Sequence, residues 1–251
     1  MKGAFWPMLR KEFRQALPAA AGIIAAVMAW QMFLYTRIGR WPMDVVLIVS
    51  ALPFGFVPLW VLSRGLSTLR QEWAGNHMYL LLSLPIPGWY IAGAKVLVVT
   101  VEGLAYGVVI GAGWLLLARG SGGLELVALE AVRLPWGAII LLGGLSLTSP
   151  LATAVVAQFS YVASRLAPRL RGLTLAVLLP LSGWFVTRAG TVLALPFLWL
   201  PHIDFTVHAV VDGVTVRSGM ALDVAPVIGS LLAVAALFWA TGTLLERDVE
   251  L

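Results

Sequence analysis

The fold is decided by the stretch LPWGAIILLGGLSLTSPLATAVVAQFSYVAS, residues 134–164, in which none of the 31 side chains carries a charge. An α-helix needs about 20 predominantly apolar residues to cross the hydrocarbon core of a bilayer. Three further uncharged runs approach or exceed that length, at residues 15–36, 45–63 and 224–245. The whole chain is 60% hydrophobic and 12% charged, whereas soluble domains are about 45–50% apolar and about 25% charged. An ordinary soluble enzyme is therefore excluded.

Two more apolar runs carry a single ionisable group each, Glu102 within residues 96–118 and Arg188 within residues 172–203. The bilayer core has no water to satisfy backbone polar groups, so spanning segments must be helices or closed barrels. The alternation of apolar and polar residues that marks a barrel strand is missing from residues 19–30. The sequence therefore predicts one all-α polytopic membrane domain over residues 1–251, with six spans at about residues 17–36, 45–63, 96–118, 134–159, 172–195 and 224–245.

The distribution of basic residues predicts the orientation of these spans. If both termini are cytoplasmic, the inner segments hold 11 of the 17 Lys and Arg residues, as the positive-inside rule requires. We therefore expect a multi-pass protein of the cell membrane with both termini in the cytoplasm. The net charge of +5 then reflects topology and attraction to anionic membrane lipids, and no nucleic-acid partner is expected. The apolar run 15–36 is too long for a signal peptide, so we expect the first span to be retained.

Two amphipathic segments flank the first two spans. In residues 2–16, Phe5, Leu9 and Phe13 recur every fourth position beside basic residues, which predicts an elbow helix lying in the headgroup plane. The alternative is a basic flank without fixed structure. Residues 64–95 separate spans two and three, and within them Ser67–Leu84 has apolar residues at roughly helical spacing until residues 85–87 (Pro-Ile-Pro) stop the pattern. We expect a short amphipathic helix pair there, on the cytoplasmic side.

The segment before the last span is expected to be external. Span five is predicted to break near Pro180 or Pro196, leaving short re-entrant or interfacial elements before span six. His202, Asp204 and His208 fall in this segment. We interpret them as residues of a surface loop, because three ligands in organised geometry, as a metal site requires, are not evident.

Sequence motifs for catalysis are absent. The chain has no cysteine, which excludes a thiolate metal site or a thiol nucleophile. It has no His-Glu-x-x-His, Gly-x-Ser-x-Gly or Walker A motif, the signatures of zinc proteases, serine hydrolases and P-loop ATPases. We therefore expect no catalytic residue, metal or cofactor in this chain.

The two intramembrane charges need an explanation, because charged side chains in a bilayer are costly and often functional. Glu102 lies seven residues after Lys95, about 10 Å along a helix. It is expected either to line a translocation path or gate, or to form a structural ion pair. Arg188 either contributes to the path or snorkels to the outer headgroups. In the same span as Glu102, Gly103-x-x-x-Gly107-x-x-x-Gly111 predicts close helix packing.

Four short motifs occur in a recognisable order. They are Lys11-Glu12, then Glu72-x-x-Gly75 followed by LLLSLPIP at residues 80–87, then Gly93-Ala94-Lys95, and finally LLERDV at residues 244–249. Together with six spans, a basic N-terminal helix and a long first cytoplasmic loop, they resemble the permease subunits of ABC-2 type transporters, in which the N-terminal helix is the elbow helix and the loop between spans two and three holds a coupling helix. The resemblance covers nearly the whole chain.

This resemblance implies a permease that works with an ABC ATPase subunit and with a second permease copy or a homologous permease, as a dimer. ATP and magnesium would bind to the ATPase, and the exported substrate would be amphipathic or hydrophobic, such as a lipid, peptide or drug-like molecule. The implied ATPase-coupling residues are Arg70, Glu72, Trp73, Gly75 and Lys95, and the implied elbow-helix residues are Arg10, Lys11, Glu12 and Arg14. Two alternatives are the membrane module of an importer and an intramembrane enzyme that uses Glu102 with Thr100, Tyr106 or Ser146.

Overall fold

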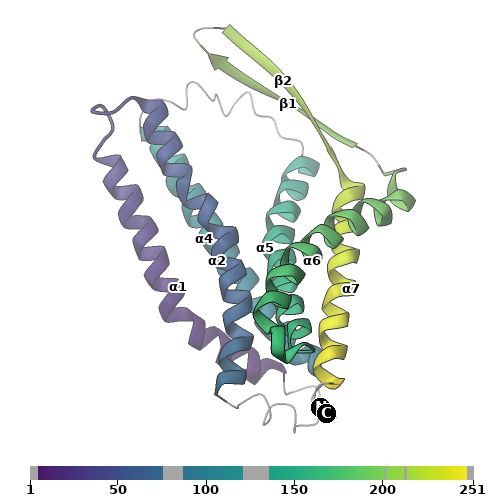
Figure 1. Cartoon of the computed structure of the whole chain (residues 1–251). Coiled ribbons are helices and arrows are strands. Elements are labelled where there is room, and N and C mark those ends of the chain that lie inside the picture. The colour runs from purple at the N-terminus through teal and green to yellow at the C-terminus, as the bar shows by residue number, and fades with distance from the viewer. Residues whose placement is uncertain (1–4, 76–86, 121–135, 201, 212–213, 248–251) are drawn as a thin grey trace.

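The computed structural model describes residues 5–75, 87–120, 136–200, 202–211 and 214–247. Within these residues six α-helices and one β-hairpin form the fold (Figure 1). The helices are α1 (Phe5–Tyr35), α2 (Met43–Ala74), α4 (Gly88–Gly120), α5 (Trp136–Ser164), α6 (Arg171–Ala194) and α7 (Val224–Arg247). The strands are β1 (His202–Val211) and β2 (Val214–Asp223).

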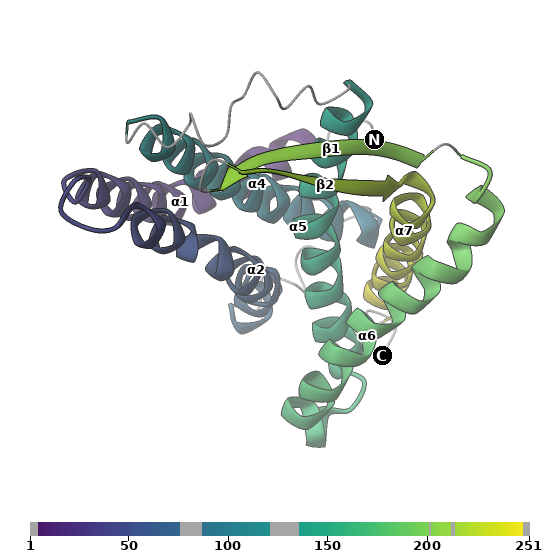
Figure 2. The same cartoon turned by 90° about the horizontal axis from the view of Figure 1, so that it is seen from above.

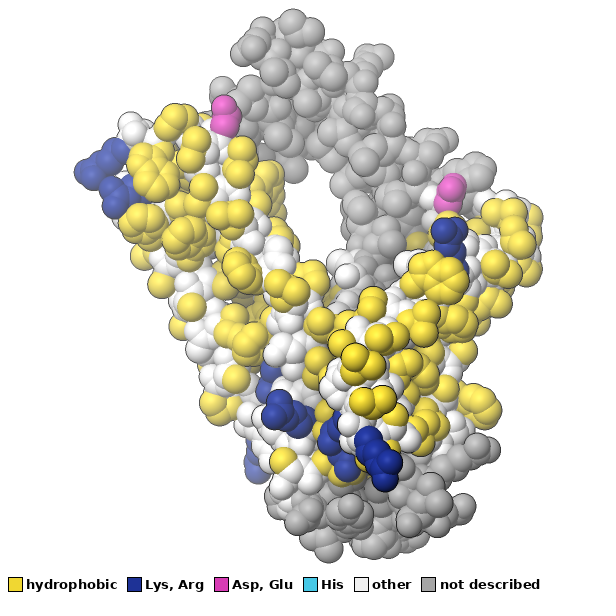
Figure 3. Space-filling view, viewed as in Figure 1, with side chains coloured by type: hydrophobic (Ala, Val, Ile, Leu, Met, Phe, Trp, Pro, Cys, Tyr) yellow, Lys and Arg dark blue, Asp and Glu magenta, His cyan; other side chains and the backbone are white. Residues whose placement is uncertain are grey.

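The helices have the length and apolar character of a multi-pass membrane protein. Among the described residues, five segments are long and apolar enough to cross a membrane, containing α1, α2, α4, α6 and α7. Many large apolar side chains on the outside of the bundle are exposed, including Met32, Ile48, Phe56, Val108 and Trp239. Figure 3 shows hydrophobic side chains over most of the described surface that faces the viewer, with Lys and Arg gathered mainly near the lower end. Such a surface is stable against lipid and not against water.

The helices alternate in direction and converge at the end that carries both termini (Figure 1). Helix α4 lies at the centre, packed against α1, α2, α5 and α7, while α6 packs against α5 and α7. Seen from above, α1, α2 and α4 form one group, and α6 and α7 lie on the other side of α5 (Figure 2). The main core is built mostly from valine and alanine side chains of the five helices α2, α4, α5, α6 and α7, among them Val61, Val99, Ala154, Val186 and Ala233.

Close helix contacts depend on particular glycines. A Cβ atom on Gly65 would lie 2.8 Å from the Cβ of Ala157, and one on Gly103 would lie 2.8 Å from Cγ2 of Val61. Small residues at such crossings let transmembrane backbones approach. The predicted stripe is only partly confirmed, because Gly107 has no atom within 4 Å of its Cβ position and Gly111 would make an ordinary contact.

The two predicted amphipathic helices are continuous with the spans that follow or precede them. Helix α1 runs unbroken from Phe5, although it changes direction in its lower part (Figure 1) and contains Pro18. A proline inside a helix removes one hydrogen bond and bends the helix without necessarily ending it. The prediction of a separate elbow helix at residues 2–16 was therefore wrong. Likewise residues 67–74 are the last turns of α2, which ends at Gly75, and residues 76–86 lie outside the described part.

The segment that the sequence predicted to be external differs most from expectation. Pro180 lies inside α6 without breaking it, whereas Pro196 lies in the 3-10 turn Leu195–Phe197 directly after α6. The chain then forms an antiparallel hairpin in which His202 of β1 pairs with Asp223 of β2, so the loop expected around His202, Asp204 and His208 is a strand. The sequence signal was present, since Asp212-Gly213 stands between two runs rich in β-branched residues, a typical hairpin pattern.

Candidate functional site

A part-buried ion pair joins α2 to α4, with the Arg64 side chain 17% exposed and that of Glu102 5% exposed. Arg64 Nε donates to Glu102 Oε2 at 3.1 Å and Arg64 Nη2 donates to Glu102 Oε1 at 3.0 Å. Such two-pronged geometry is the strongest form of Arg–carboxylate contact. Of the two roles considered for Glu102, the structure shows the ion pair, and a role in a translocation path stays a prediction.

A second group of charges, here called the ion network, ties α1, α2 and α4 together. Lys95 Nζ lies 2.8 Å from Glu12 Oε1 and 3.2 Å from Glu72 Oε1, and Lys11 Nζ lies 3.5 Å from the same oxygen of Glu72. Lys95 is only 2% exposed, and both carboxylates are buried. The network therefore unites residues that the sequence assigned to two separate units, the elbow helix and the coupling segment.

These charges form two electrically balanced layers. Lys95 precedes Glu102 by seven residues on α4, and Arg64 precedes Glu72 by eight residues on α2, so the layers lie about 10–12 Å apart along the helices. Among the described residues, the ion pairs of one layer join two cations to two anions, and those of the other layer join one of each. Pairing is the condition under which ionisable side chains are tolerated inside a membrane protein. The pairing of Arg64, Glu72 and Lys95 also explains why α2 and α4 contain charged residues outside their uncharged runs.

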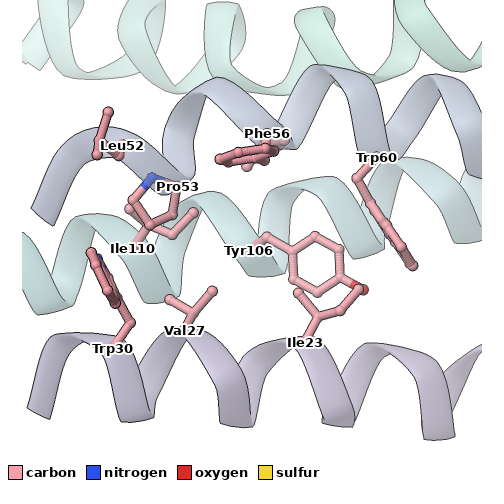
Figure 4. Close-up of a pocket in the computed structure, with 10 residues that line it drawn as sticks. Ile23, Val27, Trp30, Leu52, Pro53, Phe56, Trp60, Tyr106 and Ile110 are labelled. Carbon is pink, nitrogen blue, oxygen red and sulfur yellow. The ribbon is translucent and has the colours of Figure 1, made fainter. Parts of the chain in front are cut away.

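An apolar cleft begins one helical turn beyond the Arg64–Glu102 pair. It encloses about 470 Å³ between α1, α2 and α4. Its walls include Ile23, Val27 and Trp30 of α1, Leu52, Phe56 and Trp60 of α2, and Tyr106 and Ile110 of α4. Figure 4 shows Tyr106, Trp60 and Ile23 at one end of the cleft and Trp30, Leu52 and Ile110 at the other.

The end of the cleft near the ion pair carries two unused hydrogen-bonding groups. The Trp60 and Tyr106 rings meet edge to face at 6.2 Å between centroids. Within the described part of the chain, the indole nitrogen of Trp60 and the hydroxyl of Tyr106 are buried and make no hydrogen bond of standard geometry, although the two groups are close enough to interact with each other. Tyr106 is 2% exposed, so its unpaired hydroxyl is costly unless a ligand supplies an acceptor. The cleft thus suits a molecule that is mostly apolar and has a polar acceptor at one end.

Comparison with protein-family models, curated proteins and solved structures found no match for this chain.

The remaining residues of the predicted coupling set lie apart from the ion network. Arg70 is exposed, and Trp73 packs against Tyr161 of α5 with its ring under the guanidinium of Arg165. Gly75 ends α2, its N–H donating to the carbonyl of Gln71. The predicted coupling residues therefore fall into two groups. Glu72 and Lys95 face α1, whereas Arg70 and Trp73 face α5 and α6.

The remaining elbow residues and Arg188 lie at the surface. Arg10 and Arg14 are exposed, whereas Leu9 and Ala16 on the same helix pack against Ala94 and Val98 of α4. The apolar side of this segment therefore contacts protein, where the sequence predicted contact with lipid. Arg188 is exposed on α6, as snorkelling requires.

Sequence reasoning missed Arg64, Arg165 and Arg171. Arg64 was counted only as a topological charge, although it directly follows a 19-residue uncharged run and so lies at the depth of a span end. Its pairing with Glu102, 38 residues away, could not be read from the sequence. Arg165 and Arg171 lie on either side of the turn between α5 and α6 and stack on aromatic rings.

Proposed function

We propose that this chain is the membrane-spanning permease subunit of an ATP-driven exporter of the ABC-2 type. In this proposal it crosses the membrane six times, with α5 as the remaining span and both termini in the cytoplasm. A separate ABC ATPase supplies the energy, and two permeases enclose the pathway. Support comes from the order of the four sequence motifs and from the multi-pass helical bundle. The absence of a Walker A motif from the sequence is consistent with a partner that binds ATP.

The observation that carries the proposal is the ion network. Helix α2 ends at Gly75, next to the segment that is expected to dock on the ATPase, and Glu72 lies one turn before that end. Because Glu72 contacts Lys95 of α4 and Lys11 of α1, a displacement of the α2 end is passed directly to both helices. The same three helices line the apolar cleft. Movement at the docking end would therefore change the shape of the cleft.

The burial of Glu72 decides which residues can touch a partner. Glu72 is 6% exposed and is already paired, so we assign it the transmission of movement. Arg70 and Gln71 are exposed on the same turn and are available for direct contact. A helix end with an apolar buried side and a charged exposed side is the usual form of such a docking element.

The substrate class follows from the cleft. Its walls are apolar, and the two unpaired donors of Trp60 and Tyr106 lie at one end. We propose an amphipathic or hydrophobic substrate with a hydrogen-bond acceptor, such as a carbonyl or ester oxygen.

The enzyme alternative has less support. Both carboxylate oxygens of Glu102 accept hydrogen bonds from Arg64. The hydroxyl of Thr100 donates to the carbonyl of Val96, and that of Ser146 donates to the carbonyl of Gly143. A general base needs a free oxygen within reach of a substrate proton, and Glu102 does not present one in this arrangement.

The test is purification of the tagged full-length chain from its native membrane, followed by mass spectrometry and an ATPase assay of the eluate. The proposal predicts that an ATP-hydrolysing subunit co-purifies and that Arg70→Glu lowers its recovery several-fold. Arg169→Glu is the matched control, since Arg169 is also exposed at this end of the bundle but lies on the turn before α6. Absence of an ATPase from the wild-type eluate in several detergents would contradict the proposal.

A further inference from the structure

A second cavity of different character lies at the end of the bundle that carries both termini. It encloses about 460 Å³ between α2, the turn after α5 and the start of α6. We call it the arginine pocket, because its walls include Arg70, Arg165 and Arg171 beside Trp73, Tyr161 and Leu175. The part of Figure 3 near this end shows several basic side chains close together.

The guanidinium groups of the pocket are held in place by aromatic rings. Arg165 lies 4.3 Å from the centre of the Trp73 ring, and Arg171 lies 4.8 Å from the centre of the Tyr161 ring. Arg171 also donates a hydrogen bond to the Tyr161 hydroxyl. Tyr161 is buried and packs against Trp73, with 5.7 Å between ring centres. Stacked arginines keep their N–H edges free to bind an anion.

The pocket lacks the neutralising anions that accompany the other inward-facing cations. Lys95 and Arg64 each contact a buried carboxylate. In contrast, no Asp or Glu in the described part of the chain lies within 4 Å of the charged groups of the three pocket arginines. The segment 76–86, which follows α2, contains no acidic residue either. Arg165 and Arg171 are partly buried and Arg70 is exposed, and the described residues offer none of the three a carboxylate partner. Such a cluster favours an external anion.

Exposed leucines beside the pocket identify the kind of anion. Leu166, Leu170 and Leu173 are 61%, 62% and 65% exposed, and they lie on the same α5–α6 connection as Arg165 and Arg171. These exposed apolar side chains offer a contact surface for the acyl chains of a lipid. A free phosphate ion has no acyl chain and gains nothing from such a surface. Basic pockets between transmembrane helices are a recognised form of anionic-headgroup site.

We propose that the arginine pocket binds the headgroup of an anionic phospholipid. The phosphate lies between Arg165 and Arg171, with Arg70 at the pocket mouth and the acyl chains along the exposed leucines. Since α2 and α6 supply opposite walls of the pocket, the bound lipid links the two helix groups at their converging end. This site does not depend on the proposed transport function.

The experiment is native mass spectrometry of the purified full-length chain with added phosphatidylglycerol, phosphatidylcholine or inorganic phosphate. One phosphatidylglycerol molecule is expected to be retained in preference to phosphatidylcholine. Arg165→Gln and Arg171→Gln are each expected to weaken its retention about tenfold, because each removes a charge-assisted hydrogen bond to the phosphate. The double variant Arg165→Lys/Arg171→Lys is expected to keep most of it, and Arg169→Gln to change nothing. Unfolding temperatures in detergent check that each variant is folded.

Three results would overturn the proposal. The first is equal retention of both lipids by the wild-type chain. The second is displacement of phosphatidylglycerol by inorganic phosphate at similar concentration, which would assign the pocket to a soluble anion. The third is loss of a co-purifying protein from the arginine variants with unchanged lipid retention, which would assign the arginines to a protein contact.

Discussion

Replacing Lys95 by Met should be among the most damaging single changes in this protein. Lys95 is 2% exposed and its Nζ contacts Glu12 and Glu72. The substitution keeps the volume but removes the buried cation that two buried carboxylates share, while Lys11 stays 3.5 Å from Glu72. Removing one partner of a buried ion pair typically costs about 3–5 kcal/mol. We expect a loss of that size in the free energy of unfolding.

The same network supplies the matched control. Lys11 carries the same charge and contacts the same carboxylate, but its side chain is 48% exposed. Exposed ion pairs contribute about 0–1 kcal/mol, so Lys11→Met should change stability by no more than that. Adding Glu12→Gln to Lys95→Met removes one orphaned charge and should restore much of the loss. The assay is reversible unfolding in mixed detergent micelles, analysed as a double-mutant cycle. Equal losses for Lys95→Met and Lys11→Met would refute the burial argument.

Three further predictions concern packing and pairing in the same helices. Gly103→Ala should lower the free energy of unfolding by about 1–3 kcal/mol, because the added Cβ would meet Val61 and Pro150. Gly107→Ala is the control and should be neutral or stabilising. Both are measured by the same unfolding assay. Tyr106→Phe should raise the free energy of unfolding by about 1 kcal/mol, because it removes a buried hydroxyl without a described hydrogen-bond partner. A clear loss of stability would instead show that the hydroxyl has a partner. Arg64→Met should lower the free energy of unfolding by about 3–5 kcal/mol, and the double variant Arg64→Met/Glu102→Leu should recover most of that loss. A double variant as unstable as Arg64→Met would contradict a simple ion pair.

The sequence predicted where the helices lie better than where they end. The uncharged run at 134–164 matches α5, and α7 begins at Val224 as expected. The predicted spans 45–63 and 96–118 are shorter than α2 and α4. The sequence predicts that a span stops where charged residues begin, whereas both helices continue through such residues. In the structure Arg64 and Lys95 are helical and paired within the bundle, and no local pattern reveals a partner on another helix.

The candidate site was predicted in parts. Glu72, Lys95, Lys11 and Glu12 were all selected from the sequence, but for two separate roles. Their convergence depends on how α1 and α2 pack against α4, which is a property of the tertiary fold. The hairpin was not predicted for a different reason. Asp212-Gly213 is a typical turn pair of a β-hairpin, but the surrounding segment was interpreted as a loop with short re-entrant or interfacial elements.

In the proposed mechanism, movement driven by nucleotide at the end of α2 passes through the ion network into the cleft. The chain has no cysteine, so Met32→Cys on α1 and Ile48→Cys on α2, both exposed positions, allow specific spin labelling. The distance between the labels would be measured in the complex with the co-purified ATPase, with and without nucleotide. The account predicts a nucleotide-dependent change that is lost when Glu12→Gln, Glu72→Gln and Lys95→Met are combined. No change in the wild-type complex, or the same change in the combined variant, would contradict it.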